Sequence, residues 1–166
     1  METELGTSLG ALSERVGDLL SHRGEMLATA ESCTGGWIAQ CITDVPGSSA
    51  WFDRGFVTYS NAAKTEMLGV APGLIAEHGA VSESVVRAMV AGALRFSRAG
   101  VAVAVSGIAG PSGGSTDKPV GTVWFAWQTA ACDSVVRRVW FSGDRRDVRR
   151  QAVATALEGV LAVCRE

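Results

Sequence analysis

Five consecutive apolar residues, Val101 to Val105, have no polar side chain among them. Successive side chains of a strand point to opposite faces of the sheet, so this run has apolar groups on both faces. Both faces are covered in sheets whose parallel strands are joined by helices. The run therefore predicts a buried central strand of an α/β fold, with helices packed on each side of the sheet.

The rest of the chain supplies elements that suit this arrangement. Apolar residues at helical spacing, with capping residues and Gly stops, predict helices over residues 8–23, 37–43, 61–68, 82–97 and 144–163. Strands are predicted over residues 26–30, 52–59, 101–105, 120–128 and 134–141, and a loop with a helical turn over residues 71–79. We expect one domain over residues 1–166, a three-layer α/β/α sandwich with a mixed, mostly parallel sheet and a C-terminal antiparallel hairpin.

Composition and charge exclude several classes of function. The net charge of −2 gives no overall attraction to nucleic acid or to anionic membranes, so neither is an expected partner. Charged residues interrupt the N-terminal segment, and no apolar run is long enough to span a bilayer, so we expect a soluble cytoplasmic protein. The 4 cysteines form no C-x-x-C pair and the 2 histidines lie far from them, which favours free thiols and no metal site.

Two segments lie where ligands usually bind in such sheets, beyond the carboxyl ends of parallel strands. They are Glu31 to Gly36 and Ser106 to Gly114. In the first, Ser32 would lie near a helix N-terminus, whose free N–H groups and dipole could stabilise an oxyanion. The alternatives are that Ser32 merely caps the helix, or that Cys33 is the nucleophile.

A third segment, TYSNAAK, begins at Thr58 and ends at Lys64. Lys64 lies one helical turn after Ser60, so the two residues face the same side of the predicted helix. A lysine partly desolvated in a cleft has a lowered pKa and can act as a general base for a serine. Tyr59 could add a phenol hydrogen bond. The alternatives are that Ser60 itself is the nucleophile, or that Lys64 is a solvated surface residue.

The second of these segments and a fourth one near the C-terminus could bind an anion. The Gly-rich loop from Ser106 to Gly114 offers main-chain N–H groups suited to a phosphate or a carboxamide oxygen, but a flexible connection would be equally rich in Gly. Four arginines lie between Asp144 and Arg150 at the start of the last helix, where positive charge opposes the helix dipole. A bound phosphate would offset that repulsion, and so would the two aspartates of the segment. Arg145 and Arg146 point to different faces, so we expect one of them to reach a site.

Taken together, six segments resemble the CinA C-terminal domain family. They are AESCTGGWIA, GSSAWFDRGFVTYSNAAK, HGAVSE, SGIAGPSGG, KPVGTVWFAW and FSGDRRDVRRQA, and the resemblance runs from about Leu9 to Val163. It implies an α/β/α fold and the amidase reaction that converts nicotinamide mononucleotide (NMN) and water to nicotinate mononucleotide and ammonia. Longer CinA proteins carry an additional N-terminal domain, and this chain resembles the stand-alone amidase form.

The resemblance also implies roles for individual residues. By matching motifs, Ser32 is the nucleophile, and Tyr59 and Lys64 complete the catalytic set, with no cofactor and no metal. The expected substrate contacts are Thr34, Gly35, Asn61, Ser106, Gly107, Gly110 and Arg146. The expected partner is the small molecule NMN, and a homo-oligomer is expected.

Two other functions remain open from the sequence. A non-catalytic nucleotide-binding or regulatory module, linked to competence or DNA damage, would need Arg146 and the Gly-rich loop but not both Ser32 and Lys64. A different amidase or esterase could use the same serine and lysine on another substrate.

Overall fold

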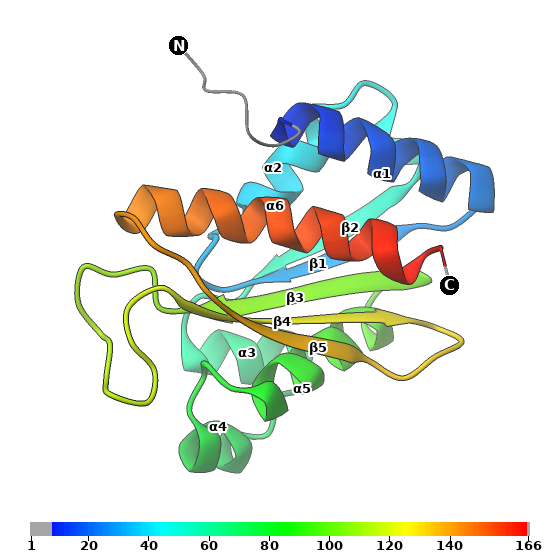
Figure 1. Cartoon of the computed structure of the whole chain (residues 1–166). Helices are drawn as coiled ribbons and strands as arrows, with labels where there is room; N and C mark the ends of the chain where they lie inside the picture. Colours follow the sequence, from blue (N-terminus) through cyan, green and yellow to red (C-terminus); the bar gives the residue numbers. More distant parts are fainter. Residues whose placement is uncertain (1–7, 166) are drawn as a thin grey trace.

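The computed structural model describes residues 8–165, and its described residues contain one five-stranded sheet. The strand order is β2-β1-β3-β4-β5 (Figure 1). The strands are β1 (Leu27–Glu31), β2 (Phe52–Val57), β3 (Val101–Gly107), β4 (Thr122–Thr129) and β5 (Val135–Trp140). β1 is parallel to β2 and β3, whereas β4 is antiparallel to β3 and β5. The predicted mixed sheet and C-terminal hairpin are therefore confirmed.

Helices cover both faces of the sheet, which confirms the predicted three layers (Figure 1). One face carries α1 (Leu9–Arg23), α2 (Trp37–Thr43) and α6 (Arg145–Val163). The other face carries α3 (Asn61–Leu68), α4 (Pro72–His78) and α5 (Glu83–Arg95), and a short 3₁₀ turn, η1 (Ser48–Ala50), precedes β2. The start of α6 and the loop after β3 lie together at one edge of the sheet (left in Figure 1).

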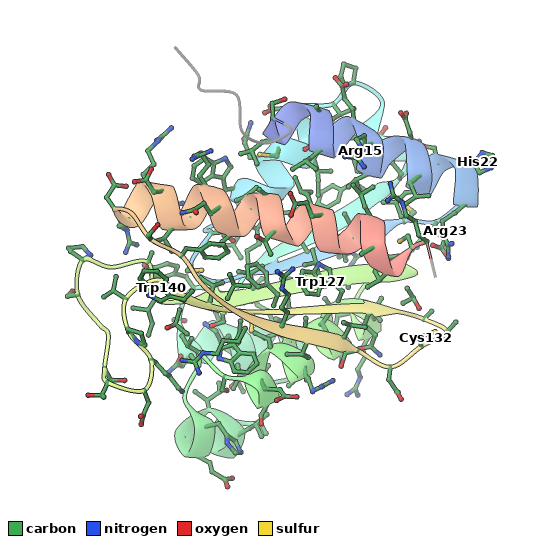
Figure 2. All side chains as sticks on the ribbon, in the orientation of Figure 1. Arg15, His22, Arg23, Trp127, Cys132 and Trp140 are labelled. Carbon is green, nitrogen blue, oxygen red and sulfur yellow. The ribbon has the colours of Figure 1, made fainter. Side chains whose placement is uncertain are left out.

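The apolar run of β3 joins two separate cores. Val101, Val103 and Val105 pack in the core beneath α1, α2 and α6, and the alternate residues Ala102 and Ala104 pack in the core beneath α5. All five side chains are fully buried, as the unbroken apolar pattern predicts. Larger side chains lie on the α6 side, where the indole N–H of Trp127 donates to the carbonyl of Ala156 (Figure 2).

The prediction for residues 71–79 was wrong, because this segment forms the helix α4 rather than a loop with one helical turn. Pro72 occupies the first turn of the helix, where its missing N–H costs nothing and its fixed φ suits the helix. Gly79, with φ of 76°, ends it. β2 also ends at Val57, two residues before the predicted end, because Ser60 caps α3 and the chain turns at once.

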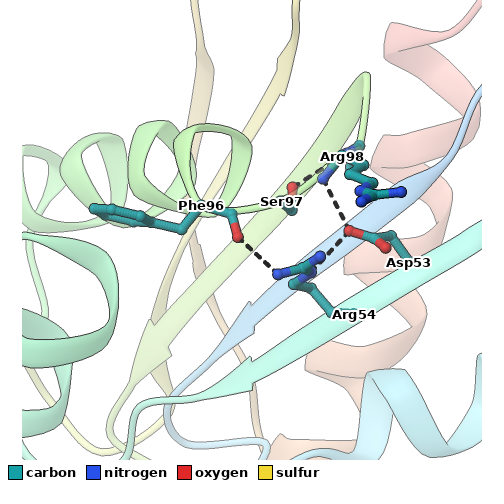
Figure 3. A network of polar contacts seen from close by, with 6 residues as sticks. Asp53, Arg54, Phe96, Ser97 and Arg98 are labelled. Atoms are coloured by element: carbon teal, nitrogen blue, oxygen red, sulfur yellow. Dashed lines mark hydrogen bonds and ion pairs between the residues drawn. The ribbon is translucent and has the colours of Figure 1, made fainter.

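A polar network fastens the edge strand β2 to the connection between α5 and β3 (Figure 3). The carboxylate of Asp53 accepts from the N–H of Arg98 at 2.9 Å and from Nε of Arg54 at 2.8 Å. Arg54 also donates to the carbonyl of Phe96 at 3.1 Å. These bonds hold the outer strand in register at the end of the sheet opposite to the predicted site.

Some predictions reach beyond the described residues. Residues 1–7 and 166 lie outside them, so the single domain over 1–166 and the interpretation of the N-terminal segment stay predictions. Within residues 8–165, no helix is long and apolar enough to cross a membrane.

Candidate active site

The carboxyl ends of β1, β2 and β3 meet at one edge of the sheet because these strands are parallel. Ser32 follows β1, Tyr59 follows β2 by two residues, and Ser106 lies at the end of β3. Around them is a cavity of about 260 Å³, called here the serine pocket. Its lining residues are Ser32, Cys33, Tyr59, Asn61, Lys64, Ala80, Val81, Ser106, Gly107, Ala109 and Arg145.

Ser32 and Lys64 are in direct contact in this pocket. Nζ of Lys64 lies 2.9 Å from Oγ of Ser32, as the predicted pairing of the two segments requires. The amine also donates to the carbonyl of Thr58 at 2.8 Å and to the carbonyl of Tyr59 at 3.2 Å. Lys64 is 1% exposed, although it lies on the short helix α3, so it is not a solvated surface lysine.

The surroundings of Lys64 favour its neutral form. Burial lowers the pKa of the Lys64 amine, since the charged form loses its hydration. The one group that raises it is the thiol of Cys33. Burial in turn raises the pKa of Cys33 to about 12, so this thiol stays uncharged near neutral pH. The Lys64 amine therefore has the property required of a general base, and Cys33 is a poor candidate nucleophile.

The N-terminus of α2 differs from what the sequence predicted. Its first N–H groups were expected to face an oxyanion, but those of Ile38 and Ala39 donate to the carboxylate of Glu31 at 2.8 and 3.0 Å. Glu31 is 1% exposed and also accepts from the hydroxyl of Thr34 at 2.7 Å. Because the Glu31 carboxylate occupies the helix start, an oxyanion would have to bind to the turn that precedes it.

Tyr59 contributes to the site by two different groups. Its main-chain carbonyl accepts from Lys64, whereas its phenol oxygen accepts from Nη2 of Arg145 at 3.2 Å. The side chain is 61% exposed at the mouth of the serine pocket. Arg145 also donates to the carbonyl of Gly110 at 2.9 Å, so it joins β2's end to the Gly-rich loop.

A second cavity of about 500 Å³ adjoins the serine pocket, and we call it the basic pocket. The two cavities share Ala109 and Arg145 among their lining residues. The basic pocket is lined by Ala109, Pro111, Val120, Gly143, Asp144, Arg145, Arg146 and Arg149. Arg146 and Arg149 lie over the ring of Trp37, with guanidinium carbons 5.5 and 5.3 Å from its centroid. Positive charge is thus concentrated beside the serine pocket.

The predicted substrate contacts fall into three groups. Asn61, Ser106 and Gly107 line the serine pocket, and Arg146 lines the basic pocket. Gly110 reaches the site only through its carbonyl bond to Arg145. Thr34 and Gly35 line neither cavity; the Thr34 hydroxyl is turned to Glu31, and Gly35 lies beside Arg149.

Sequence reasoning missed Glu31, and it favoured Arg146 over Arg145 by motif. The expectation that one of these two arginines reaches a site was wrong, because both line the basic pocket and Arg145 also lines the serine pocket. Nothing in the pattern marked Glu31, because a glutamate at a strand end is usually solvated. Within residues 8–165, no three His, Cys, Asp or Glu side chains gather as metal ligands would, and the prediction that no metal is needed stays a prediction.

Comparison with known proteins places this arrangement in a family. The CinA C-terminal domain matches residues 9–164. This chain belongs to the CinA C-terminal domain family. A relative from Escherichia coli K12, nicotinamide-nucleotide amidohydrolase PncC, is 61% identical over 152 residues, which cover 92% of both chains. A protein of the same name from Pseudomonas putida is 57% identical over 90% of this chain and 93% of that protein.

Longer relatives and solved structures support the same assignment. A putative competence-damage inducible protein from Symbiobacterium thermophilum is 52% identical over 92% of this CinA-family chain but only 38% of its own length. The crystal structure of competence/damage inducible protein CihA from Agrobacterium tumefaciens has a TM-score of 0.92 and 44% identity, covering 97% of this chain and 99% of that one. The resemblance found in the sequence is therefore confirmed.

Proposed function

We propose that this chain is an amidase that hydrolyses the carboxamide of NMN, giving nicotinate mononucleotide and ammonia. The observation that carries the proposal is the contact of 2.9 Å between the buried amine of Lys64 and the hydroxyl of Ser32. The names of relatives up to 61% identical supply the substrate. A module that only binds nucleotides would have no use for a buried amine on a serine hydroxyl.

The hydrogen bonds of Lys64 set the direction of proton transfer. A neutral amine has two N–H bonds and one lone pair. The carbonyls of Thr58 and Tyr59 can accept the two N–H bonds, which turns the lone pair toward Oγ of Ser32. The hydroxyl of Ser32 then donates to Lys64 and gives up its proton as its oxygen attacks the carboxamide carbon.

The remaining steps use the same two side chains. The tetrahedral intermediate collapses, the C–N bond breaks, and the Lys64 ammonium returns its proton to the departing nitrogen, so that ammonia leaves. A water molecule then attacks the acyl-enzyme and gives a proton to Lys64. The C–O bond to Ser32 breaks, the Lys64 ammonium returns the proton to the Ser32 oxygen, and nicotinate mononucleotide leaves. We place the oxyanion against the N–H groups of Cys33 and Thr34, since Glu31 occupies those of Ile38 and Ala39.

The two adjoining cavities divide the substrate between them. The pyridine carboxamide enters the serine pocket beside Ser32, Asn61 and Ser106, and the phosphate enters the basic pocket. There Arg145 and Arg146 supply guanidinium groups, which bind phosphate through paired N–H donors. Arg145 lines both cavities, so it lies where ribose and phosphate would pass from one to the other.

The proposal also covers the cellular location and the partners of the protein. The substrate is a small molecule, and we propose that the chain acts in the cytoplasm, where pyridine nucleotides are recycled, without nucleic-acid or membrane partners. We also propose a homo-oligomer, which the exposed apolar side chains Val135 and Trp140 of the edge strand β5 support.

The test measures ammonia release from NMN by the purified protein, with and without prior treatment with a chelator. Wild type is expected to be active in both cases, and Ser32→Ala is expected to lose activity at least about a thousandfold while keeping its fold. Calorimetry with NMN runs beside the assay. Binding of NMN without ammonia release would favour the regulatory module, and release from other amides or esters instead of NMN would favour a different hydrolase.

A further inference from the structure

The turn from Ser32 to Gly36 is held from two sides by charged side chains that the proposed reaction does not use. On one side is Glu31, whose carboxylate accepts from the Thr34 hydroxyl and from the N–H groups of Ile38 and Ala39. Burial raises the pKa of Glu31, and these hydrogen bonds oppose the rise. Among the ion pairs of residues 8–165, none involves this carboxylate.

Helix capping alone does not explain a buried carboxylate at this position. A Ser, Thr or Asn side chain at the N-cap would accept from one of these main-chain N–H groups at a lower desolvation cost. The N-cap of α2 is instead Gly36, with φ of 100° and no side chain. Glu31 reaches the donors from the strand that precedes Ser32, so it ties the end of β1, the turn and α2 into one unit.

On the other side is Arg149 of α6. Its Nε donates to the carbonyl of Cys33 at 3.0 Å and its Nη2 donates to the carbonyl of Thr34 at 3.2 Å. The guanidinium also lies over the ring of Trp37, the first residue of α2. Gly35, which has φ of 58°, packs beside this guanidinium, since a Cβ built on it would lie 3.5 Å from Nη2 of Arg149. The Glu31 carboxylate therefore accepts hydrogen bonds from the turn and the start of α2, and the Arg149 guanidinium donates to carbonyls of the turn.

We propose that Glu31 and Arg149 are positioning residues that hold Ser32 in line with Lys64. The proposal rests on the proposed function, because it requires Ser32 to be the nucleophile. The main-chain N–H of Ser32 is fixed by the carbonyl of Val105, so the freedom left to the hydroxyl depends on the turn that follows it. A displacement of the nucleophile by about 1 Å can cost about a hundredfold in rate.

The experiment compares steady-state kinetics of Glu31→Gln and Arg149→Met with NMN. Glu31→Gln keeps the size of the side chain but turns an NH₂ group toward N–H donors. Glu31 lines neither cavity, so kcat is expected to fall about 10- to 100-fold with KM changed by less than about twofold. Arg149→Met is expected to lower kcat by a similar factor. Arg150→Met, an exposed neighbour on the same helix, is the control and keeps wild-type kinetics.

Circular dichroism and thermal unfolding establish that each variant is folded before its kcat is interpreted. Folded variants with wild-type kcat at saturating NMN would overturn the proposal, and a rise in KM alone for Arg149→Met would make Arg149 a phosphate ligand instead. If Glu31→Gln does not fold, Arg149→Met decides together with Arg149→Lys, whose single ammonium cannot reproduce the paired bonds and is expected to restore little of kcat. Wild-type ammonia release by Ser32→Ala would instead remove Ser32 as the nucleophile, and absence of ammonia release from NMN by the wild-type protein would refute the proposed function itself.

Discussion

Lys64 is a titratable side chain whose hydrogen-bond partners are two carbonyls and one hydroxyl, none of which ionises near neutral pH. Its protonation therefore depends mainly on burial, which lowers its pKa from the ordinary value of 10.5. The protonated amine cannot accept the serine proton. Activity is therefore expected at pH values above the pKa of Lys64, where its amine is neutral.

The first prediction is that kcat/KM for NMN rises with pH and reaches a plateau, with a midpoint below 10.5. The measurement is initial ammonia release across about pH 6 to 10 in buffers of constant ionic strength. Lys64→Met is the control and should show a low rate without this rise. A wild-type profile that is flat over the same range would contradict the assignment of Lys64 as base.

The second prediction concerns the thiols. Cys132 is exposed in the turn between β4 and β5 (Figure 2), whereas Cys33, Cys41 and Cys164 are buried. Iodoacetamide near neutral pH is expected to modify Cys132 alone and to leave amidase activity unchanged, since the buried thiols have raised pKa values. Peptide mapping by mass spectrometry locates the adduct. Modification of Cys33 in parallel with loss of activity would make that thiol a rival nucleophile.

The residues of the site were predictable to different degrees. Ser32 and Lys64 follow neighbouring parallel strands, and this topology brings them to one edge of the sheet, so pattern and motif sufficed. Which arginines at the start of α6 reach the two cavities depends on the rotation of this helix, and the reciprocal bonds of Asp144 and Asp147 fix its first turn. A sequence pattern contains no information on that rotation.

At the scale of elements, α5 packs against α3 at a distance set by one small residue. A Cβ built on Gly92 of α5 would overlap the main-chain carbonyl of Leu68, the last residue of α3. Main-chain atoms cannot turn away as a flexible side chain can. The α3 helix carries Lys64, so its close packing against α5 also fixes the position of the proposed base.

The third prediction is that Gly92→Ala lowers the free energy of unfolding by about 1–3 kcal/mol, because overpacking forces the two helices apart. Gly73→Ala in α4 is the matched control, since no atom lies within 4 Å of its added Cβ. That substitution is expected to raise stability by about 0.5 kcal/mol. Urea unfolding measures both, and equal effects of the two variants would show that the contact with Leu68 does not limit the packing.

Boundaries of elements were less predictable than their existence. The α4 helix has too few apolar residues for a periodic pattern, so Pro72 and Gly79 suggested a loop, although Pro at the first turn and Gly at the end also suit a helix. The strand β3 was predictable over residues 101–105, where burial on both faces leaves no polar side chain, but it continues through the buried Ser106 to Gly107, two residues past the predicted end.

At the scale of the whole molecule, the sheet separates two cores that share their strands. Trp51 and Trp127 are buried in the core beneath α1, α2 and α6, whereas Gly92 lies on the opposite face, in α5. The odd and even residues of β3 belong to different cores, so unfolding of this strand would expose both cores at once.

The fourth prediction is that both cores unfold together. Gly92→Ala is expected to lower the urea midpoint equally when unfolding is followed by tryptophan fluorescence and by far-ultraviolet circular dichroism. The fluorescence reports mainly on the face that the substitution does not touch. A fluorescence midpoint that stays at the wild-type value while the dichroism midpoint falls would show that the two halves unfold independently.

Two of the three groups that bind the amine of Lys64 are main-chain oxygens, and a point substitution does not remove them. A substitution of Tyr59 therefore leaves both of these carbonyl bonds to Lys64 in place and changes only the phenol. Its phenol faces Arg145 at the rim, where it would meet whatever enters. A library randomised at this single codon could thus be screened for amides of other shapes. The main chain of residue 59 binds the Lys64 amine, whereas its side chain lies at the rim of the pocket.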